Sequence, residues 1–349
     1  MAGTTILEHE LSELRLLVER QTGILLDCPN SALAAHVAEY LESHELESPS
    51  ALLDRLRAAD QDPAALPGFL DGVLNVNTGF FRHPGAMNAL ARQVIPQLYA
   101  RKSDDGPCTL RIWSAGCGTG EETYSIAMAL CNAMPNGNGS SNGNGNKEIK
   151  EKNSSGRNGG IVESSAVTNQ ETRDWSIHIV GSDLLPSAIE VAERGLYPQS
   201  ALAGLPPATI RACFSKIGSP NGQNGGQSGS QETSANGSAS GSSGSAPSPY
   251  LLVKPRLRSL VTFNTMNLTK PVYIGRFDCI FCMDVLPHLS RAQRTALMER
   301  LHLYLEPGGY LFLSQTEKLS SPNLNFRSET FDGYTFHRKP LAASAAYGR

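Results

Sequence analysis

The sequence has no long hydrophobic run, little net charge and few aromatic side chains. No apolar stretch reaches the about 18 residues of a membrane-spanning helix, so no membrane insertion is expected. Residues 1–20 contain acids and no uninterrupted apolar core, which argues against a signal peptide and predicts a cytoplasmic protein. The net charge of -3 and the pI near 6.3 give no sign of nucleic-acid binding.

Cysteine is sparse, and its one close pair does not have the setting of a zinc or redox site. The chain has 7 cysteines, and Cys279 and Cys282 are spaced C-x-x-C. They fall within a strand pattern, where residues i and i+3 point to opposite faces of the sheet. Both are therefore expected to be buried free thiols, and no metal site is predicted.

The chain also lacks the two commonest glycine-rich nucleotide motifs, although it has a glycine loop. An apolar run at 110–115 is followed by Gly116-Cys117-Gly118-Thr119-Gly120, and a helical pattern begins at about Glu121. This spacing is not G-x-x-x-x-G-K-[ST], which argues against ATP or GTP, and it is not G-x-G-x-x-G, which makes NAD less favoured. Such a loop suits a ligand that must approach the backbone closely, although an ordinary tight turn is an alternative.

A second apolar run, at 176–182, ends at Asp183. A carboxylate at the end of the second strand is placed to accept hydrogen bonds from ribose hydroxyls. The alternative is an N-cap for a helix beginning near Pro186. Together with the glycine loop, Asp183 favours S-adenosylmethionine, which has a ribose but no pyrophosphate.

The pattern along the chain predicts two domains and an α/β fold. Residues 1–95 read as a small all-α domain, with a helix start at Ser48-Pro49-Ser50, and 96–340 as a Rossmann-like S-adenosylmethionine-dependent methyltransferase domain, followed by a tail at 341–349. Strands are expected at 109–115, 176–182, 260–266, 277–283 and 309–314, with a terminal hairpin at 325–338 that turns at Asp332-Gly333. Helices are expected at 120–134, 186–194, 206–215 and 290–304. Inserts at 135–172 and 217–249, rich in Asn, Gly and Ser, are expected to be disordered.

Several motifs occur in the order seen in one known family. They are Asn77-Thr78-Gly79-Phe80-Phe81-Arg82, Trp113 to Ala127 with the glycine loop, Gly181-Ser182-Asp183, Arg194-Gly195-Leu196-Tyr197, Met266-Asn267-Leu268, Phe277 to Cys282, Pro307 to Leu313, and Thr316-Glu317. In this order the chain resembles the CheR-type chemotaxis-receptor methyltransferases, from about residue 10 to residue 338 apart from the inserts. The family carries a small antiparallel β-subdomain near the position of the second insert.

The resemblance implies transfer of a methyl group from S-adenosylmethionine to glutamate carboxylates of chemoreceptors. It assigns Thr78 and Arg82 to the methionine end of the cofactor, Asp183 to the ribose, and Asn267 and Leu268 to the adenine. The remaining cofactor-binding positions that it implies are Gly116, Gly118, Glu121 or Glu122, Met283 and Asp284. For Phe80 and Phe81, core packing is expected rather than contact with the substrate.

The sequence departs from the family pattern at three places. Val76, between Asn75 and Asn77, replaces an asparagine, and Met283, Asp284 and His288 replace the family's arginine, asparagine and tyrosine. Asp284 and His288 could instead form a base for a hydroxyl, amine or thiol acceptor, or Asp284 could hold cofactor while His288 packs at a helix start. A cofactor-binding signalling scaffold without catalysis is a further alternative.

The third departure is the charge of the N-terminal domain, where the family carries a basic helix. Residues 32–60 hold six acids against two bases, Arg55 and Arg57; the acids are Glu39, Glu42, Glu45, Glu47, Asp54 and Asp60. This face would not attract an acidic partner, and a solvated acidic surface is the default interpretation.

Overall fold

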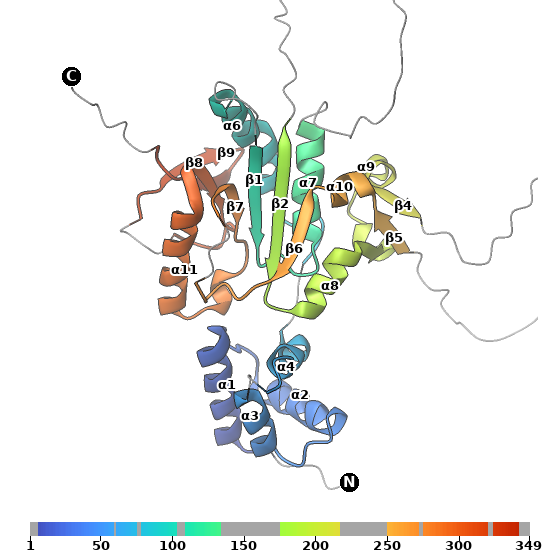
Figure 1. The fold of residues 1–349 in the computed structure, drawn as a ribbon, viewed down its shortest axis with the longest axis vertical. Helices are drawn as coiled ribbons and strands as arrows, with labels where there is room; N and C mark the ends of the chain where they lie inside the picture. Colours follow the sequence, from blue (N-terminus) through green and yellow to red (C-terminus); the bar gives the residue numbers. More distant parts are fainter. Residues whose placement is uncertain are drawn as a thin grey trace, which may run out of the picture.

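The computed structural model describes residues 6–58, 61–74, 78–102, 109–133, 175–216, 250–271, 275–319 and 324–341. Both predicted inserts and the tail beyond Leu341 lie outside these residues. A helical N-terminal domain lies against one end of a twisted sheet that has helices on both faces (Figure 1). Among the described residues, no helix combines the length and apolar character needed to cross a bilayer.

The central sheet has seven strands in the order β6-β2-β1-β7-β8-β10-β9. The first five strands are parallel, and β10 and β9 close the sheet as an antiparallel hairpin. The bounds are β1 Thr109–Ala115, β2 Ser176–Asp183, β6 Val261–Thr265, β7 Phe277–Phe281, β8 Leu305–Phe312, β9 Arg327–Phe331 and β10 Tyr334–Arg338. The predicted α/β class, the parallel strands and the hairpin turn at Asp332-Gly333 are thus confirmed.

The two faces of the sheet have separate cores, as the parallel arrangement requires. The helical elements of this domain are α5 Pro84–Ala89, the π-helical turn η1 Leu90–Val94, α6 Ile95–Lys102, α7 Glu121–Ala133, α8 Pro186–Arg194, α10 Pro255–Arg258 and α11 Arg291–Tyr304. Cys279 belongs to the core shared with α5 and α7, whereas Cys282 belongs to the core shared with α11. The two thiols therefore lie on opposite faces, and burial raises the pKa of both.

A second, three-stranded antiparallel sheet has the order β3-β5-β4 and lies beside α8 and α10. It consists of β3 Leu196–Pro198, β4 Phe214–Lys216 and β5 Tyr250–Val253, with the short helices η2 Gln199–Leu202 and α9 Pro207–Cys213 between β3 and β4. It brackets the second insert, as the resemblance implied. Phe80 packs edge-on against Tyr197 and Phe214, with ring centroids 5.0 and 5.5 Å away, so its predicted packing role is confirmed.

The core of the N-terminal domain is built from α1 Glu8–Thr22, α2 Asn30–Ser43, α3 Pro49–Arg57 and α4 Ala65–Val73, and Leu185 and Ala188 at the start of α8 also pack into it. The predicted helix start is confirmed, since Ser48 caps α3 by accepting a hydrogen bond from the Ala51 N–H at 3.2 Å. After Leu70, the next buried side chains among the described residues, from Ala86 to Leu98, pack in the core of the central sheet. The change from one core to the other therefore falls before α5, earlier in the chain than residue 95.

The two domains are joined by the chain segment that follows α1. Thr22 accepts a hydrogen bond from the Thr269 hydroxyl at 2.8 Å, and the Leu25 N–H donates to the carbonyl of His288 at 2.8 Å. On the other side of the joint, Ser187 of α8 donates to Asp71 of α4. These bonds hold the N-terminal domain against the carboxyl ends of the parallel strands (Figure 1).

Gly181 in β2 has no room for a side chain. A Cβ atom there would lie 2.6 Å from the Phe263 ring and 2.8 Å from the Thr123 hydroxyl, whereas a Cβ at Gly204 would meet nothing within 4 Å. We expect Gly181→Ala to lower the free energy of unfolding by about 1–3 kcal/mol through overpacking. Urea denaturation measures this, with Gly204→Ala as the matched control; equal stability of the two variants would contradict the packing described for β2.

Candidate functional site

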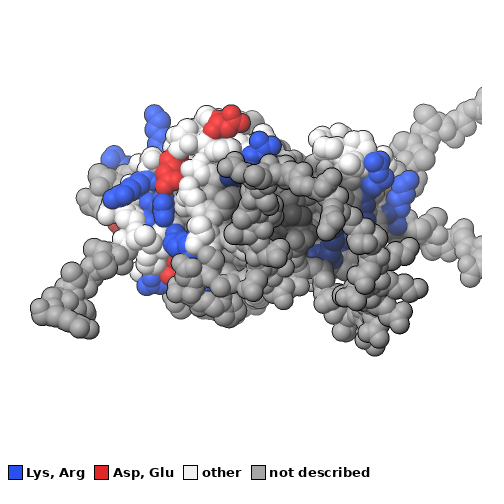
Figure 2. Space-filling model, turned by 90° about the horizontal axis from the view of Figure 1, so that it is seen from above, with Lys and Arg blue, Asp and Glu red and all other residues white. Residues whose placement is uncertain are grey.

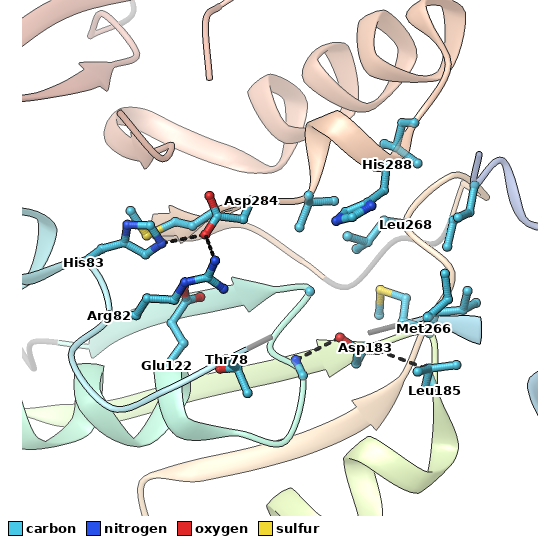
Figure 3. Close-up of a pocket in the computed structure, with 18 of the residues that line it drawn as sticks. Thr78, Arg82, His83, Glu122, Asp183, Leu185, Met266, Leu268, Asp284 and His288 are labelled. Atoms are coloured by element: carbon cyan, nitrogen blue, oxygen red, sulfur yellow. Dashed lines mark hydrogen bonds and ion pairs between the residues drawn. The ribbon is translucent and has the colours of Figure 1, made fainter. Parts of the chain in front are cut away.

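A cavity of about 200 Å³ lies between the domains, at the carboxyl ends of the strands. This is where ligands bind in open α/β sheets. It collects all but one of the site residues predicted from the sequence: Thr78, Arg82, Gly116, Gly118, Glu122, Asp183, Asn267, Leu268, Met283, Asp284 and His288. Figure 3 shows the polar groups along its wall. Positions 75–77, where Val76 replaces the family's asparagine, lie outside the described residues.

Asp183 links the glycine loop to the start of α8. Its Oδ2 accepts a hydrogen bond from the Gly118 N–H at 2.8 Å, and its Oδ1 accepts one from the Leu185 N–H at 3.1 Å. Burial raises the pKa of Asp183, and the backbone donors oppose that rise. Leu185, not Asp183, is the N-cap residue of α8. The carboxylate is thus fixed at the cavity wall, where each oxygen still has a lone pair for a ribose hydroxyl.

The glycine loop approaches its neighbours closely. Gly116 has a φ of 81°, and a Cβ atom there would lie 2.5 Å from the side chain of Val285, which also lines the cavity. A side chain at this position would therefore both strain the backbone and narrow the cavity.

The two consecutive glutamates at the start of α7 have different surroundings. Glu122 lines the cavity, and its Oε1 accepts a hydrogen bond from the Ser114 hydroxyl at 2.6 Å. Glu121 is buried outside the cavity lining, where its Oε2 accepts a hydrogen bond from the Thr119 hydroxyl at 2.7 Å. Successive helical residues point about 100° apart, so only one of the two can face the cavity. That residue is Glu122.

Apolar side chains form the wall beside Asp183. Met266 and Leu268 follow β6, and Leu185 faces them in Figure 3. The Asn267 side chain is engaged within its own turn: its Oδ1 accepts a hydrogen bond from the Thr269 N–H at 2.9 Å and lies 2.8 Å from the Thr269 hydroxyl, whose single proton is shared with the Thr22 carbonyl. It shapes the turn that presents Leu268.

At the other end of the cavity, Asp284 is paired with two residues of the segment before α5. Its Oδ2 lies 2.8 Å from His83 Nε2 and 3.4 Å from the Arg82 guanidinium (Figure 3). The sequence suggested that Asp284 and His288 form a general base together. The structure corrects this pairing, because Asp284 contacts His83 instead. His288 is exposed on a different part of the wall, because the short helix η3 Leu286–His288 carries its side chain away.

The backbone supports this cluster in unusual conformations. Asp284 has a φ of 58° and Phe81 a φ of 52°. Aspartate tolerates this left-handed region better than most residues, whereas for phenylalanine it is strained. The Phe81 N–H donates to the Ser125 hydroxyl at 2.9 Å, which helps to hold the segment that carries Arg82 and His83.

Glu317 stabilises the turn at Asp284 by accepting hydrogen bonds from its backbone. This residue was assigned no role from the sequence. Its Oε2 accepts hydrogen bonds from the N–H groups of Asp284 and Ser314, at 3.1 and 2.9 Å, and its Oε1 accepts one from Leu286 at 2.9 Å. The feature of the sequence that could have pointed to Glu317 is the Thr316-Glu317 motif directly after a predicted strand. His83 was missed as well, although it directly follows the motif that ends at Arg82.

The cavity therefore has a fixed carboxylate and an apolar wall at one end, and Arg82 with two carboxylates at the other. This set of groups matches a ligand that has a ribose, a flat aromatic base and a charged amino-acid group. The arrangement fits S-adenosylmethionine without any change to the residues present.

Comparison with known proteins supports S-adenosylmethionine as the cofactor. The sequence model of the family described as CheR methyltransferase, SAM binding domain, matches residues 76–142 and 240–334. Chemotaxis protein methyltransferase 1 of Pseudomonas aeruginosa is 26% identical over 310 residues, which cover 88% of this chain and 89% of that protein. The chain belongs to the CheR methyltransferase family. It is thus an S-adenosylmethionine-dependent methyltransferase.

Other relatives extend over a similar length. The chemotaxis protein methyltransferase of Vibrio parahaemolyticus is 24% identical over 323 residues, covering 92% of this chain and 93% of that protein. Among solved structures, magnesium protoporphyrin IX methyltransferase from Synechocystis PCC 6803 with bound SAM is 13% identical, with a TM-score of 0.28, over 75% of this chain and 85% of that one. At that score the structural similarity adds nothing to the assignment.

The role of Glu317 can be tested by removing one acceptor oxygen. Glu317→Gln keeps the shape but leaves at least one of three backbone N–H groups facing an amide NH₂. We expect the free energy of unfolding to fall by about 1–3 kcal/mol and S-adenosylhomocysteine to bind more weakly. Denaturation and calorimetry measure the two effects. Glu299→Gln, an exposed change on α11, is the control; a Glu317 variant as stable as this control would refute the assigned role.

Proposed function

We propose that the protein methylates glutamate side-chain carboxylates of chemoreceptor proteins. The observation that carries the proposal is the pairing of Asp284 with His83 and Arg82. Alone, an ionised Asp284 would repel an incoming carboxylate. Paired in this way, its charge is offset by the Arg82 guanidinium and its Oδ2 is occupied by His83, and the other N–H groups of Arg82 can donate to an anionic acceptor.

The cofactor is proposed to lie along the cavity with its ribose at Asp183 and its adenine against Leu268. Its amino-acid end then lies near Thr78, Arg82 and Glu122. When bound, S-adenosylmethionine supplies an electrophilic methyl group on a sulfonium. The gap between this end and the Asp183 end is spanned by the glycine loop, whose Gly118 N–H is already engaged by Asp183.

The chain's own part in the reaction is positioning. An ionised carboxylate needs no proton removed before it attacks, so no base is required. Arg82 would orient the acceptor, while Asp284 and Glu317 fix the segment opposite it. Much of the acceleration can come from this orientation and from exclusion of water.

The charge of the two domains suggests where an acidic receptor would dock. The described residues 6–74 hold 12 acids and 4 bases, whereas the described residues 78–341 hold 12 acids and 20 bases. Arg55 and Arg57, the bases near α2, pair with Asp62 and Asp54 of their own domain. Figure 2 looks onto the end of the methyltransferase domain away from the N-terminal domain and the cavity, and the Lys and Arg side chains seen there illustrate the basic character of this domain. We therefore place the acidic partner on the methyltransferase domain.

A second candidate is methylation of an acceptor that must lose a proton, such as a hydroxyl or an amine. The His83–Asp284 pair favours it, since a carboxylate that orients a histidine is a common general-base arrangement. The two candidates differ in the stability of the product, because methyl esters are hydrolysed by base and methyl ethers or methylamines are not.

The proposal is tested by incubating the protein with methyl-labelled S-adenosylmethionine and a cytoplasmic chemoreceptor fragment. We expect the receptor to gain label that mild base releases as methanol, and we expect Asp183→Ala to lower labelling at least tenfold. Base-stable label would favour the second candidate. An unlabelled receptor, with cofactor bound normally, would refute both the acceptor and the docking site.

The affinity for S-adenosylmethionine should depend on pH through Glu122. Burial, and then the charges of Asp284 and Glu317, raise the pKa of Glu122 to about 7. A bound cation favours the ionised carboxylate, so below pH 7 binding must first expel a proton. We expect affinity to rise by up to about tenfold per pH unit below 7 and to level off above it. Calorimetry at pH 5.5–8.5 measures this rise.

Two comparisons make that measurement specific. Glu122→Gln should flatten the pH dependence, because the titrating group is gone. S-adenosylhomocysteine, which lacks the sulfonium charge, should show a shallower dependence than S-adenosylmethionine. Identical pH profiles for wild type and Glu122→Gln would show that another group is responsible.

A further inference from the structure

Helix α11 sends two arginine side chains to the loops that line the cavity. Arg294 donates from Nε to the carbonyl of Leu289 at 2.8 Å and from a terminal nitrogen to that of Pro287 at 3.2 Å. Arg300, further along the helix, donates to the carbonyls of Leu268 and Thr269 at 2.7 and 2.9 Å. Each arginine thus holds two carbonyls of one loop.

The Arg300 bonds fall on the turn proposed to hold the adenine. Asn267 closes this turn from within, because its Oδ1 accepts a hydrogen bond from the Thr269 N–H, and the Thr22 carbonyl of the N-terminal domain accepts a hydrogen bond from the Thr269 hydroxyl. Arg300 binds the two carbonyls from the outside of the turn. The turn is therefore held from three directions: by its own first residue, by the N-terminal domain and by α11.

The geometry of a guanidinium suits this task. Its terminal nitrogens form a planar fork that can hold two acceptors at a fixed spacing, whereas an ammonium is a single point with no plane. The Arg300 side chain is half-buried, and Arg300 is not among the residues that line the cavity. Any effect of Arg300 on a ligand must therefore pass through the turn.

We propose that Arg300 is a positioning residue for the adenosine half of the cofactor. Its fork fixes the Leu268–Thr269 segment, and that segment keeps the Leu268 side chain against the adenine. The inference rests on the proposed placement of adenine at Leu268. It adds a residue of α11, outside the motifs that identify the family, to the cofactor-binding machinery.

Two ligands that differ only at the amino-acid end separate this role from a general effect. S-adenosylhomocysteine has both halves, and 5′-methylthioadenosine lacks the amino-acid group. We expect Arg300→Gln to weaken binding of both by the same factor, about tenfold, as measured by calorimetry. With the receptor fragment as acceptor, the KM for S-adenosylmethionine should rise and kcat at saturation should stay near that of wild type.

Three further variants calibrate the result. Arg82→Gln, at the other end of the cavity, should weaken S-adenosylhomocysteine but not 5′-methylthioadenosine. Arg300→Lys, which keeps the charge and the stem, should bind with an affinity between those of wild type and Arg300→Gln, and it decides the question if Arg300→Gln does not fold. Arg291→Gln, an exposed change on the same helix, should bind both ligands as wild type does.

Two outcomes would overturn the proposal. One is wild-type affinity of Arg300→Gln for both ligands. The other is a loss confined to S-adenosylhomocysteine, since the adenosine half would then be unaffected. A failure of the proposed site has a different signature: Asp183→Ala and Leu268→Ala would bind 5′-methylthioadenosine as wild type does, which would place adenosine elsewhere and remove the basis for a role of Arg300.

Discussion

The carboxylate of Asp183 is the interaction on which the geometry of the site depends. It accepts one hydrogen bond from the glycine loop after β1 and another from the start of α8 after β2. Two loops from adjacent parallel strands are thereby held at a fixed spacing. Burial raises the pKa of Asp183, and the backbone donors that surround it counteract that rise by stabilising the ionised carboxylate.

The rest of the cavity is arranged around that fixed point by long-range contacts. Asp284 is held by Glu317 through its backbone N–H and by His83 through its side chain, so three distant parts of the chain meet at the amino-acid end. At the adenosine end, the segment after α1 contacts the loops that follow β6 and β7. The N-terminal domain is thus part of the cavity wall, with Thr22 and Ile24 among the lining residues.

The sequence could predict those features that depend on local pattern. Apolar runs that end in glycine or acid predicted β1 and β2, and Asp332-Gly333 predicted the hairpin turn. The motif order led to the cavity residues, except that spacing alone could not decide between Glu121 and Glu122. The π-helical turn at Leu90–Val94 and the short strands β3 to β5 carry no such pattern, since three or four residues are too few for a period to be seen.

What the sequence could not predict are pairings between residues far apart in the chain. His83 and Asp284 are separated by 201 positions, and Thr22 and Thr269 by 247. The interpretation of Asp284 and His288 as a pair used nearness in sequence, and it was wrong because η3 separates their side chains in space. The Glu317 carboxylate was missed for a related reason: its partners are backbone N–H groups, which look alike in every sequence.

The most direct test of the account is a crystal structure of the protein with S-adenosylhomocysteine. We predict that the ribose hydroxyls contact Asp183, that the adenine lies against Leu268, and that the homocysteine end lies by Arg82 and Glu122. A ligand bound in the reverse direction, or bound outside the cavity between the domains, would contradict the assignment of the site.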